Sequence, residues 1–131
     1  MKSSLLLFFL AATPTQATTP EAWQFVYVTR SSDLQVTSGR ALLTRTGNQV
    51  TGELTGQNGV KFSIHARLVG AKVTAEFGSL ESDDGGTRLA GTFRQSPMPA
   101  VGGDSCWQTF QLSDGFSSLA LARNAPQCDQ R

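Results

Sequence analysis

Apolar and polar residues alternate with a period of two through the centre of the chain, from residue 39 to residue 94. Strict alternation is typical of strands that bury one face, and paired residues of an antiparallel ladder share a face. Short segments that contain Gly separate the alternating runs, which is the pattern of hairpins in series. This region therefore predicts an antiparallel meander whose strands are joined by tight turns.

Three of the turns can be checked against the strands that they join, because the length of a turn sets the register of its hairpin. The segments 47–48 and 70–71 predict two-residue loops, and 57–59 predicts a three-residue loop with Gly59 at positive φ. With these lengths the three turns agree on one buried face. The predicted pairs are Leu43 with Gly52, Ala41 with Leu54, Arg45 with Val50, Leu54 with Phe62, Gly52 with Ile64, Leu68 with Val73, Ala66 with Ala75 and Ile64 with Phe77.

The next turn leaves its register open. The segment 82–86, Ser-Asp-Asp-Gly-Gly, is a strong turn signal. A loop of two or four residues would pair Leu80 with Leu89, which puts Leu89 on the wrong face. Either a loop with an odd number of residues, such as 84–86, or a β-bulge at Gly78 would restore the buried face.

The flanking segments complete an all-β chain of about eight strands with no helix. Residues 23–28 predict a first strand with apolar groups on both faces, so that a further segment is expected over one of them. Residues 31–38 are polar, with a turn at 32–33, and 106–112 and 118–123 predict the last two strands. We predict a small antiparallel up-and-down meander barrel rather than the alternative, a two-sheet β-sandwich. Glycines inside strands, which suit the bends of a closed barrel, favour this choice: Gly52, Gly78 and Gly91.

The N-terminus has the layout of a secretory signal peptide. Lys2 precedes an uncharged apolar run at residues 5–12, and small residues flank a cleavage position after Ala17. The apolar run is too short for the alternative, a membrane anchor, because a spanning helix needs about 20 residues. We therefore expect residues 1–17 to be removed, residues 18–131 to form one domain, and the protein to be secreted or periplasmic, with no membrane span.

Charge and cysteine content narrow the classes of partner. Without residues 1–17 the chain carries equal numbers of basic and acidic residues and no basic run, so nucleic acid is not expected as a partner. Cys106 and Cys128 are the two cysteines of an exported chain, which predicts one structural disulfide.

Catalytic signals are weak. His65 is the single histidine, and the predicted register places Glu76 opposite it on the polar face. A surface ion pair between them is the favoured interpretation, and a catalytic set with Ser63 is the alternative. The acidic cluster of Glu81, Asp83 and Asp84 reads as a turn rather than a calcium loop. We therefore expect no enzymatic activity, no metal and no cofactor.

Residues 95–105 form the longest stretch without a pattern, and Pro97 and Pro99 predict an irregular loop there, because proline removes backbone donors. Long irregular loops in compact domains are often functional. Taken alone, the loop is expected to bury its apolar groups and cap one mouth of the barrel, with an exposed docking tip as the alternative. If the barrel binds a protein partner, we predict that this loop, extended by Trp107, carries the contact. The candidate binding residues are Met98, Ala100, Val101 and Trp107.

In strand number, size and export the chain resembles the small secreted meander barrels, such as the avidin-like fold and the bacterial inhibitors of proteases and lysozyme. The resemblance extends to no residue motif, so it assigns no functional residue. We expect a non-enzymatic binding module with a protein partner or a small apolar ligand, and inhibition of a hydrolase as one form of that binding. The alternatives are an envelope interaction module without a pocket and a hydrolase whose site is not recognised. Small residues such as Ala66 and Gly91 at inward positions leave open whether the interior is filled or hollow.

Overall fold

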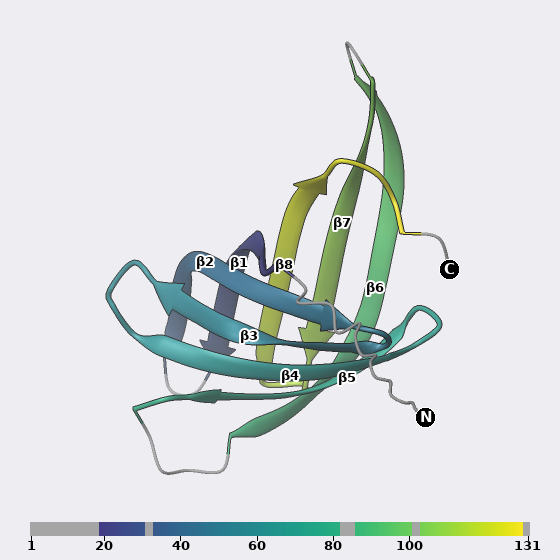
Figure 1. Ribbon diagram of the computed structural model, residues 1–131. Coiled ribbons are helices and arrows are strands. Elements are labelled where there is room, and N and C mark those ends of the chain that lie inside the picture. Colours follow the sequence, from purple (N-terminus) through teal and green to yellow (C-terminus); the bar gives the residue numbers. More distant parts are fainter. Residues whose placement is uncertain (1–18, 31–32, 82–85, 101–102, 130–131) are drawn as a thin grey trace, which may run out of the picture.

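The computed structural model describes residues 19–30, 33–81, 86–100 and 103–129, and the predicted signal peptide lies outside them. The described residues form eight strands in one closed antiparallel barrel, in which each strand pairs with the next and the last with the first (Figure 1). The predicted up-and-down barrel is therefore confirmed, and the sandwich is excluded. The strands are β1 (Glu21–Arg30), β2 (Leu34–Thr46), β3 (Gln49–Gly56), β4 (Lys61–Val69), β5 (Lys72–Ser79), β6 (Thr87–Ala100), β7 (Gly103–Ser113) and β8 (Ser117–Ala125).

The register predicted from the first three turns is confirmed. The ladders of β2–β3, β3–β4 and β4–β5 contain all eight predicted pairs. Each of the three turns has a glycine with positive φ, at 62° for Gly47, 87° for Gly59 and 63° for Gly70. A residue with a Cβ rarely adopts this conformation, which explains why these turns carry glycine.

The turn between β5 and β6 has an odd number of residues between paired positions but is longer than predicted. Phe77 lies opposite Thr87 and Ala75 opposite Leu89, so that Leu89 faces the interior. The three-residue loop 84–86 is therefore wrong. The bulge at Gly78 is not needed, because the pairing of Phe77 with Thr87 already puts Leu89 on the inward face.

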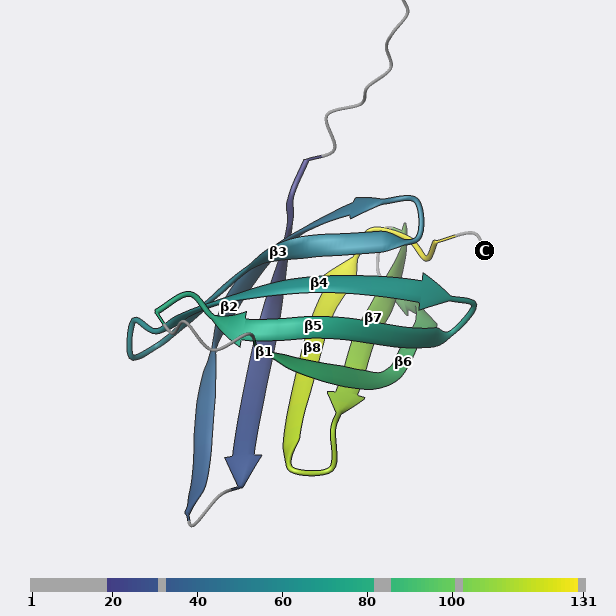
Figure 2. The same ribbon diagram turned by 90° about the horizontal axis from the view of Figure 1, so that it is seen from below.

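The hairpin of β1 and β2 is longer than the sequence pattern predicted. Residues 34–38, expected in a polar turn region, continue β2 as far as the Arg30–Leu34 pair. Val26 on the outer face of β1 is 43% exposed, so the expected cover over that face is absent among the described residues. Figure 2 shows the resulting shape, in which β3, β4 and β5 cross β1, β7 and β8 at a steep angle.

Inward side chains from all eight strands pack across the barrel interior. At one end Tyr27, Phe62 and Phe77 lie against one another, with ring centroids 4.7 to 5.6 Å apart. Nearer the other end, the ring centroid of Phe110 lies 5.2 Å from that of Trp23 and 4.8 Å from that of Phe93. Aromatic pairs at such distances add to the stabilisation from buried area.

Glycines at inward positions do not leave the interior hollow. A Cβ on Gly52 would lie 2.1 Å from the carbonyl oxygen of Leu42, and one on Gly91 would lie 1.7 Å from that of Gln111. Both distances are far inside van der Waals contact. These glycines therefore let neighbouring strands approach closely where the sheet bends, as closure of a small barrel requires.

We predict that Phe77→Ala lowers the free energy of unfolding by ~3–5 kcal/mol, because Phe77 is buried within the aromatic cluster. The matched control is Lys61→Ala on the exposed face of β4, which should change it by no more than about 0.5 kcal/mol. Chemical denaturation measures both. Equal losses from the two variants would contradict the assignment of faces.

We also predict that Gly91→Ala destabilises the barrel by about 3 kcal/mol or more, because the added methyl group meets backbone rather than a mobile side chain. The neighbouring Thr92→Ala should cost less than about 1 kcal/mol. The urea midpoints of the two variants test the close approach of β6 and β7. A Gly91→Ala protein as stable as wild type would show that the strands do not approach so closely.

Candidate binding surface

The hairpin of β6 and β7 projects beyond the rest of the barrel (Figure 1). β6 pairs with β5 only as far as Thr92, and β7 pairs with β8 only from Cys106 onward. Beyond these points the two arms pair with each other, out to Ala100 and Gly103. The predicted irregular loop at 95–105 is therefore wrong, because residues 95–100 and 103–105 belong to regular strands.

Pro97 and Pro99 fit this hairpin because of the direction in which their nitrogens face. The N–H of Phe93 donates to the carbonyl of Ala71, away from β7, at 2.8 Å. N–H directions alternate along a strand, so the nitrogens of residues 95, 97 and 99 face the same way, toward the free edge of β6. The prolines thus cost no bond in the β6–β7 ladder, and they remove two donors from an edge that another strand could otherwise pair with.

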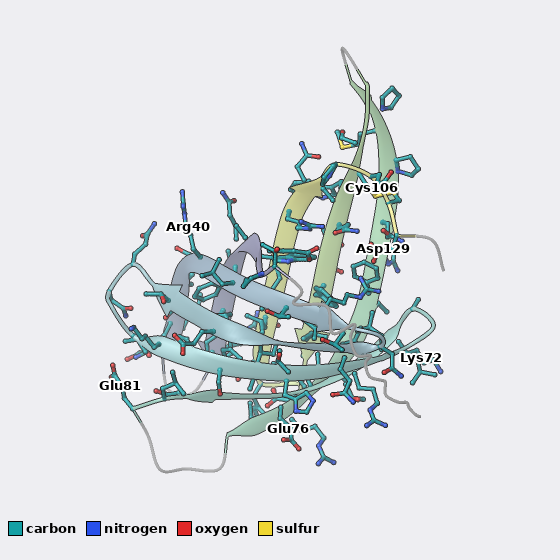
Figure 3. All side chains as sticks on the ribbon, viewed as in Figure 1. Arg40, Lys72, Glu76, Glu81, Cys106 and Asp129 are labelled. Atoms are coloured by element: carbon teal, nitrogen blue, oxygen red, sulfur yellow. A yellow bond between two sulfur atoms is a disulfide. The ribbon has the colours of Figure 1, made fainter. Side chains whose placement is uncertain are left out.

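The C-terminal segment anchors the base of the hairpin. The predicted disulfide joins Cys106 of β7 to Cys128, and Figure 3 shows Cys106 and Asp129 at this base. The side-chain amide of Gln95 accepts a hydrogen bond from the N–H of Asp129 at 2.8 Å and donates one to its carbonyl at 3.2 Å. Arg45 forms an ion pair with the Asp129 carboxylate. Strands β2, β6 and β7 are therefore tied to the C-terminal segment below the projecting part.

A buried polar network closes the adjacent barrel mouth. Gln108, 1% exposed, donates to Gln95 and accepts from Arg123, each at 2.9 Å. Arg123 also bonds to Glu21 at 3.1 Å, and its guanidinium lies over the ring of Trp23, 5.5 Å from the centroid. Trp23 is therefore buried beneath Arg123 at this end of the core.

The outer face of the hairpin holds two of the four predicted binding residues. Met98 pairs with Ser105 and Ser96 with Trp107, so Met98 and Trp107 are diagonal neighbours on one face. We call these four residues the hairpin face. Met98 is 46% exposed and Trp107 is 44% exposed, so neither caps the barrel mouth.

The other two predicted binding residues, Ala100 and Val101, are near the tip of the hairpin sequence. Ala100 forms the outermost described pair of the hairpin, with Gly103. Val101 lies outside the described residues.

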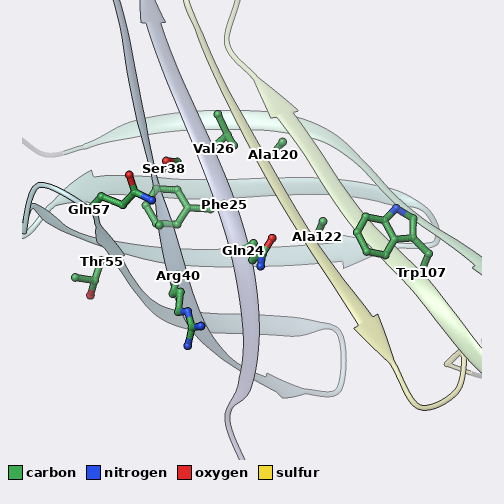
Figure 4. Close-up of a pocket in the computed structure, with 11 residues that line it drawn as sticks. Gln24, Phe25, Val26, Ser38, Arg40, Thr55, Gln57, Trp107, Ala120 and Ala122 are labelled. Carbon is green, nitrogen blue, oxygen red and sulfur yellow. The ribbon is translucent and has the colours of Figure 1, made fainter.

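A groove that sequence reasoning missed continues from Trp107 across the outer wall (Figure 4). It has a volume of about 790 Å³ and lies over β1, β2 and β8. Gln24 pairs with Arg40 on one side and with Ala122 on the other, and Val26 pairs with Ser38 and Ala120 in the same way. We call this the outer-wall groove; its outward-facing lining residues are Gln24, Val26, Ser38, Arg40, Thr55, Gln57, Trp107, Ala120 and Ala122.

The groove exists because β8 carries small side chains at outward positions. Ala120 and Ala122 form its floor between the indole of Trp107 and the longer side chains of β1 and β2 (Figure 4). A smaller hollow of about 330 Å³ shares Trp107 and Ala122 and extends to Asn124. The signal in the sequence was the presence of apolar residues at outward positions, Val26 in the first strand and the two alanines in the last.

The wall residues considered for catalysis are not arranged as a catalytic set. Ser63, His65 and Glu76 line one hollow of about 370 Å³, and His65 and Glu76 are opposite in register as predicted. The predicted ion pair between them is wrong, however. Glu76 instead pairs with Arg88 at 3.5 Å, and the Nε2 of His65 lies 3.2 Å from the side-chain oxygen of Gln49.

Other chemistry in the described part of the chain is structural. Asp114 closes the β7–β8 turn by accepting the N–H groups of Ser117 at 2.7 Å and Phe116 at 2.8 Å, and these bonds lower the pKa of its carboxyl group. The described residues contain no group of three or more potential metal ligands, and Asp83 and Asp84 lie outside them. Among the described residues there is also no apolar helix of a length that spans a bilayer.

Neither a scan of protein-family models nor searches of curated proteins and of solved structures give a match to this chain. The assignment of function therefore depends on the hairpin face and the outer-wall groove themselves.

Proposed function

We propose that this protein is an exported, non-enzymatic binding barrel that docks a protein partner on the hairpin face and the outer-wall groove, in the manner of an inhibitor of a hydrolase. The observation that carries the proposal is Trp107. Its indole is nearly half exposed at the junction of the two surfaces. Tryptophan is the residue type most enriched among the side chains that dominate binding energy at protein interfaces.

The base of the hairpin that presents Trp107 is held by strand pairing and by a disulfide, which favours its use as a docking element. Both arms lie in a continuous ladder, and the disulfide holds the base to the C-terminal segment. A surface that is ordered before binding loses little conformational entropy when the partner arrives. Inhibitors that present a fixed projecting segment to an enzyme use this property.

The packing of the interior argues against the small apolar ligand as the principal partner. Nineteen buried side chains from all eight strands form one core cluster, and the aromatic residues fill both ends of it. An eight-stranded barrel either fills its interior with side chains or holds one small ligand. The outer-wall groove lies outside this core.

The two alternative functions would use other parts of the barrel. An envelope interaction module would use the far end of the barrel, where Leu34, Val36 and Phe116 are each at least 60% exposed. A hydrolase would need His65 and Glu76 to act together, but each is bonded to another side chain. The hairpin face is favoured because its exposed aromatic side chain, Trp107, lines a groove.

Export is supported by the disulfide, because such bonds persist in oxidising compartments. We predict that the exported protein begins near Thr18 and has no thiol that reacts with an alkylating agent. Mass spectrometry of the non-reduced protein, with and without alkylation, measures both features. An intact Met1 start or two alkylated cysteines would contradict the prediction.

We predict that Trp107→Ala weakens capture of the partner from the exported fraction by about 2 kcal/mol or more, roughly thirtyfold. The melting temperature should change little, because the indole lies outside the core cluster. Met98→Ser should weaken capture less. The matched control is Leu80→Ser, an exposed apolar residue that follows β5, which should leave both quantities unchanged.

Two results would count against the docking proposal. Capture that survives Trp107→Ala would place the partner elsewhere on the barrel. A large fall in melting temperature together with lost capture would show that Trp107 holds the hairpin in place rather than the partner.

A further inference from the structure

We infer that the outer-wall groove receives an acidic, apolar segment of the partner, with an apolar side chain against Trp107 and the alanine floor and a carboxylate on Arg40. This inference rests on the proposed function and specifies the chemistry of the partner. It depends on three features of the groove: its floor, its charge and the absence of free backbone groups.

The floor of the groove favours an apolar side chain. Ala120 and Ala122 offer methyl groups only, and Val26 and Trp107 border them with larger apolar surfaces. An apolar side chain placed there removes these surfaces from water without leaving a polar group unpaired.

The charge of the groove favours a carboxylate. Arg40 is the one charged residue among its lining, and it projects from the same side of the barrel as the hairpin (Figure 3). Glu53 of β3 occupies the same outward face, one diagonal step away, but it does not line the groove and forms no ion pair with Arg40. The other polar residues that line the groove, such as Gln24 and Gln57, are neutral, and a guanidinium binds a carboxylate through two parallel hydrogen bonds.

The backbone around the groove leaves side chains as the means of recognition. At the groove itself, Gln24 of β1, Arg40 of β2 and Ala122 of β8 are each paired with a strand on both sides, so these positions offer no edge to which a partner strand could be added. The free edge of β6 lacks two donors because of Pro97 and Pro99. The partner must therefore bind through its side chains, laid across the strands rather than along them.

The spacing of the two anchor points sets the length of the segment. Trp107 on β7 and Arg40 on β2 are separated by β8 and β1, which corresponds to about 14 Å at the usual strand spacing. An extended chain covers that distance in about four residues. The expected segment thus has an apolar residue and an acidic residue a few positions apart.

The test uses short acetylated and amidated peptides that carry one Leu and one Glu separated by Gly/Ser spacers of increasing length, and a matched set with Gln in place of Glu. The full exported chain, labelled with ¹⁵N, is titrated with each peptide. We expect shifts of the Trp107 indole and the Gln24 amide, and affinities for the Glu peptides about tenfold or more above those for the Gln peptides.

Two variants make the test specific. Arg40→Gln should abolish the preference for Glu, whereas Glu53→Gln should retain it. Raised salt should weaken the Glu peptides selectively, because the contact with Arg40 is exposed. A matched uncharged oligosaccharide that shifts the same resonances without regard to Arg40 would show that the groove binds sugars, and would overturn the inference.

The inference also fails if no peptide shifts the groove resonances, or if Glu and Gln peptides bind equally. Such a failure is distinguishable from failure of the proposed function. Suppose that the Trp107→Ala protein no longer captures the native partner but the Arg40→Gln protein captures it normally. The docking surface is then supported, and the inference of an acidic ligand is wrong. If neither substitution affects capture, the docking surface itself is wrong.

Discussion

Closure of the backbone ladder between β1 and β8 is the constraint on which the rest of this structure depends. It leaves each strand of the barrel paired on both sides, so alternate residues are committed either to the interior or to the outer wall. Aromatic and branched aliphatic side chains occupy the inward positions and pack against one another. With the interior occupied in this way, recognition of a partner falls to the outer wall and to whatever projects from it.

The β6–β7 hairpin extends beyond this closure. Its two strands run further than the strands beside them. A disulfide to the C-terminal segment and side-chain hydrogen bonds between Gln95 and Asp129 anchor the extension. Two prolines remove hydrogen-bond donors from its free edge. The result is an anchored projection with Met98 and Trp107 on its outer face, next to a groove that the alanines of β8 create. An anchored base, an exposed indole and an adjacent charged groove are together the properties expected of a docking surface.

The sequence predicted correctly those features that residues close together in the chain determine. It failed where a feature depends on strands that are distant in the chain. The turns at Gly47, Gly59 and Gly70 are short and need positive φ, so local pattern was enough to set the register of four strands. The longer turn after β5 has no such constraint, so its register stayed open, with an odd number of loop residues as one of two alternatives. Pro97 and Pro99 misled the prediction of an irregular loop because the direction in which their nitrogens face depends on the pairing of β6 with its neighbours.

The candidate surface was foreseen in part for the same reason. Met98 stood out as an apolar residue without a strand pattern, Trp107 was expected to extend its patch from the neighbouring strand, and the two do share a face. The groove depends on the pairing of β8 with β1, which are far apart in the sequence, so no local pattern links Arg40 with Ala122. Similarly, the bonds of His65 and Glu76 involve Gln49 and Arg88, which lie on other strands.

The central claim is that a partner contacts the outer wall around Trp107 and leaves the interior closed. The two tryptophans report on these two places, since Trp107 is nearly half exposed and Trp23 is buried. The most direct measurement is ¹⁹F NMR of fluorotryptophan-labelled protein, with the Trp107 resonance assigned from Trp107→Phe, before and after addition of the captured partner. We predict that the Trp107 resonance shifts and loses its solvent isotope effect while that of Trp23 stays unchanged. A shift of Trp23 with an unchanged Trp107 would show that binding occurs at the barrel mouth and would contradict the account.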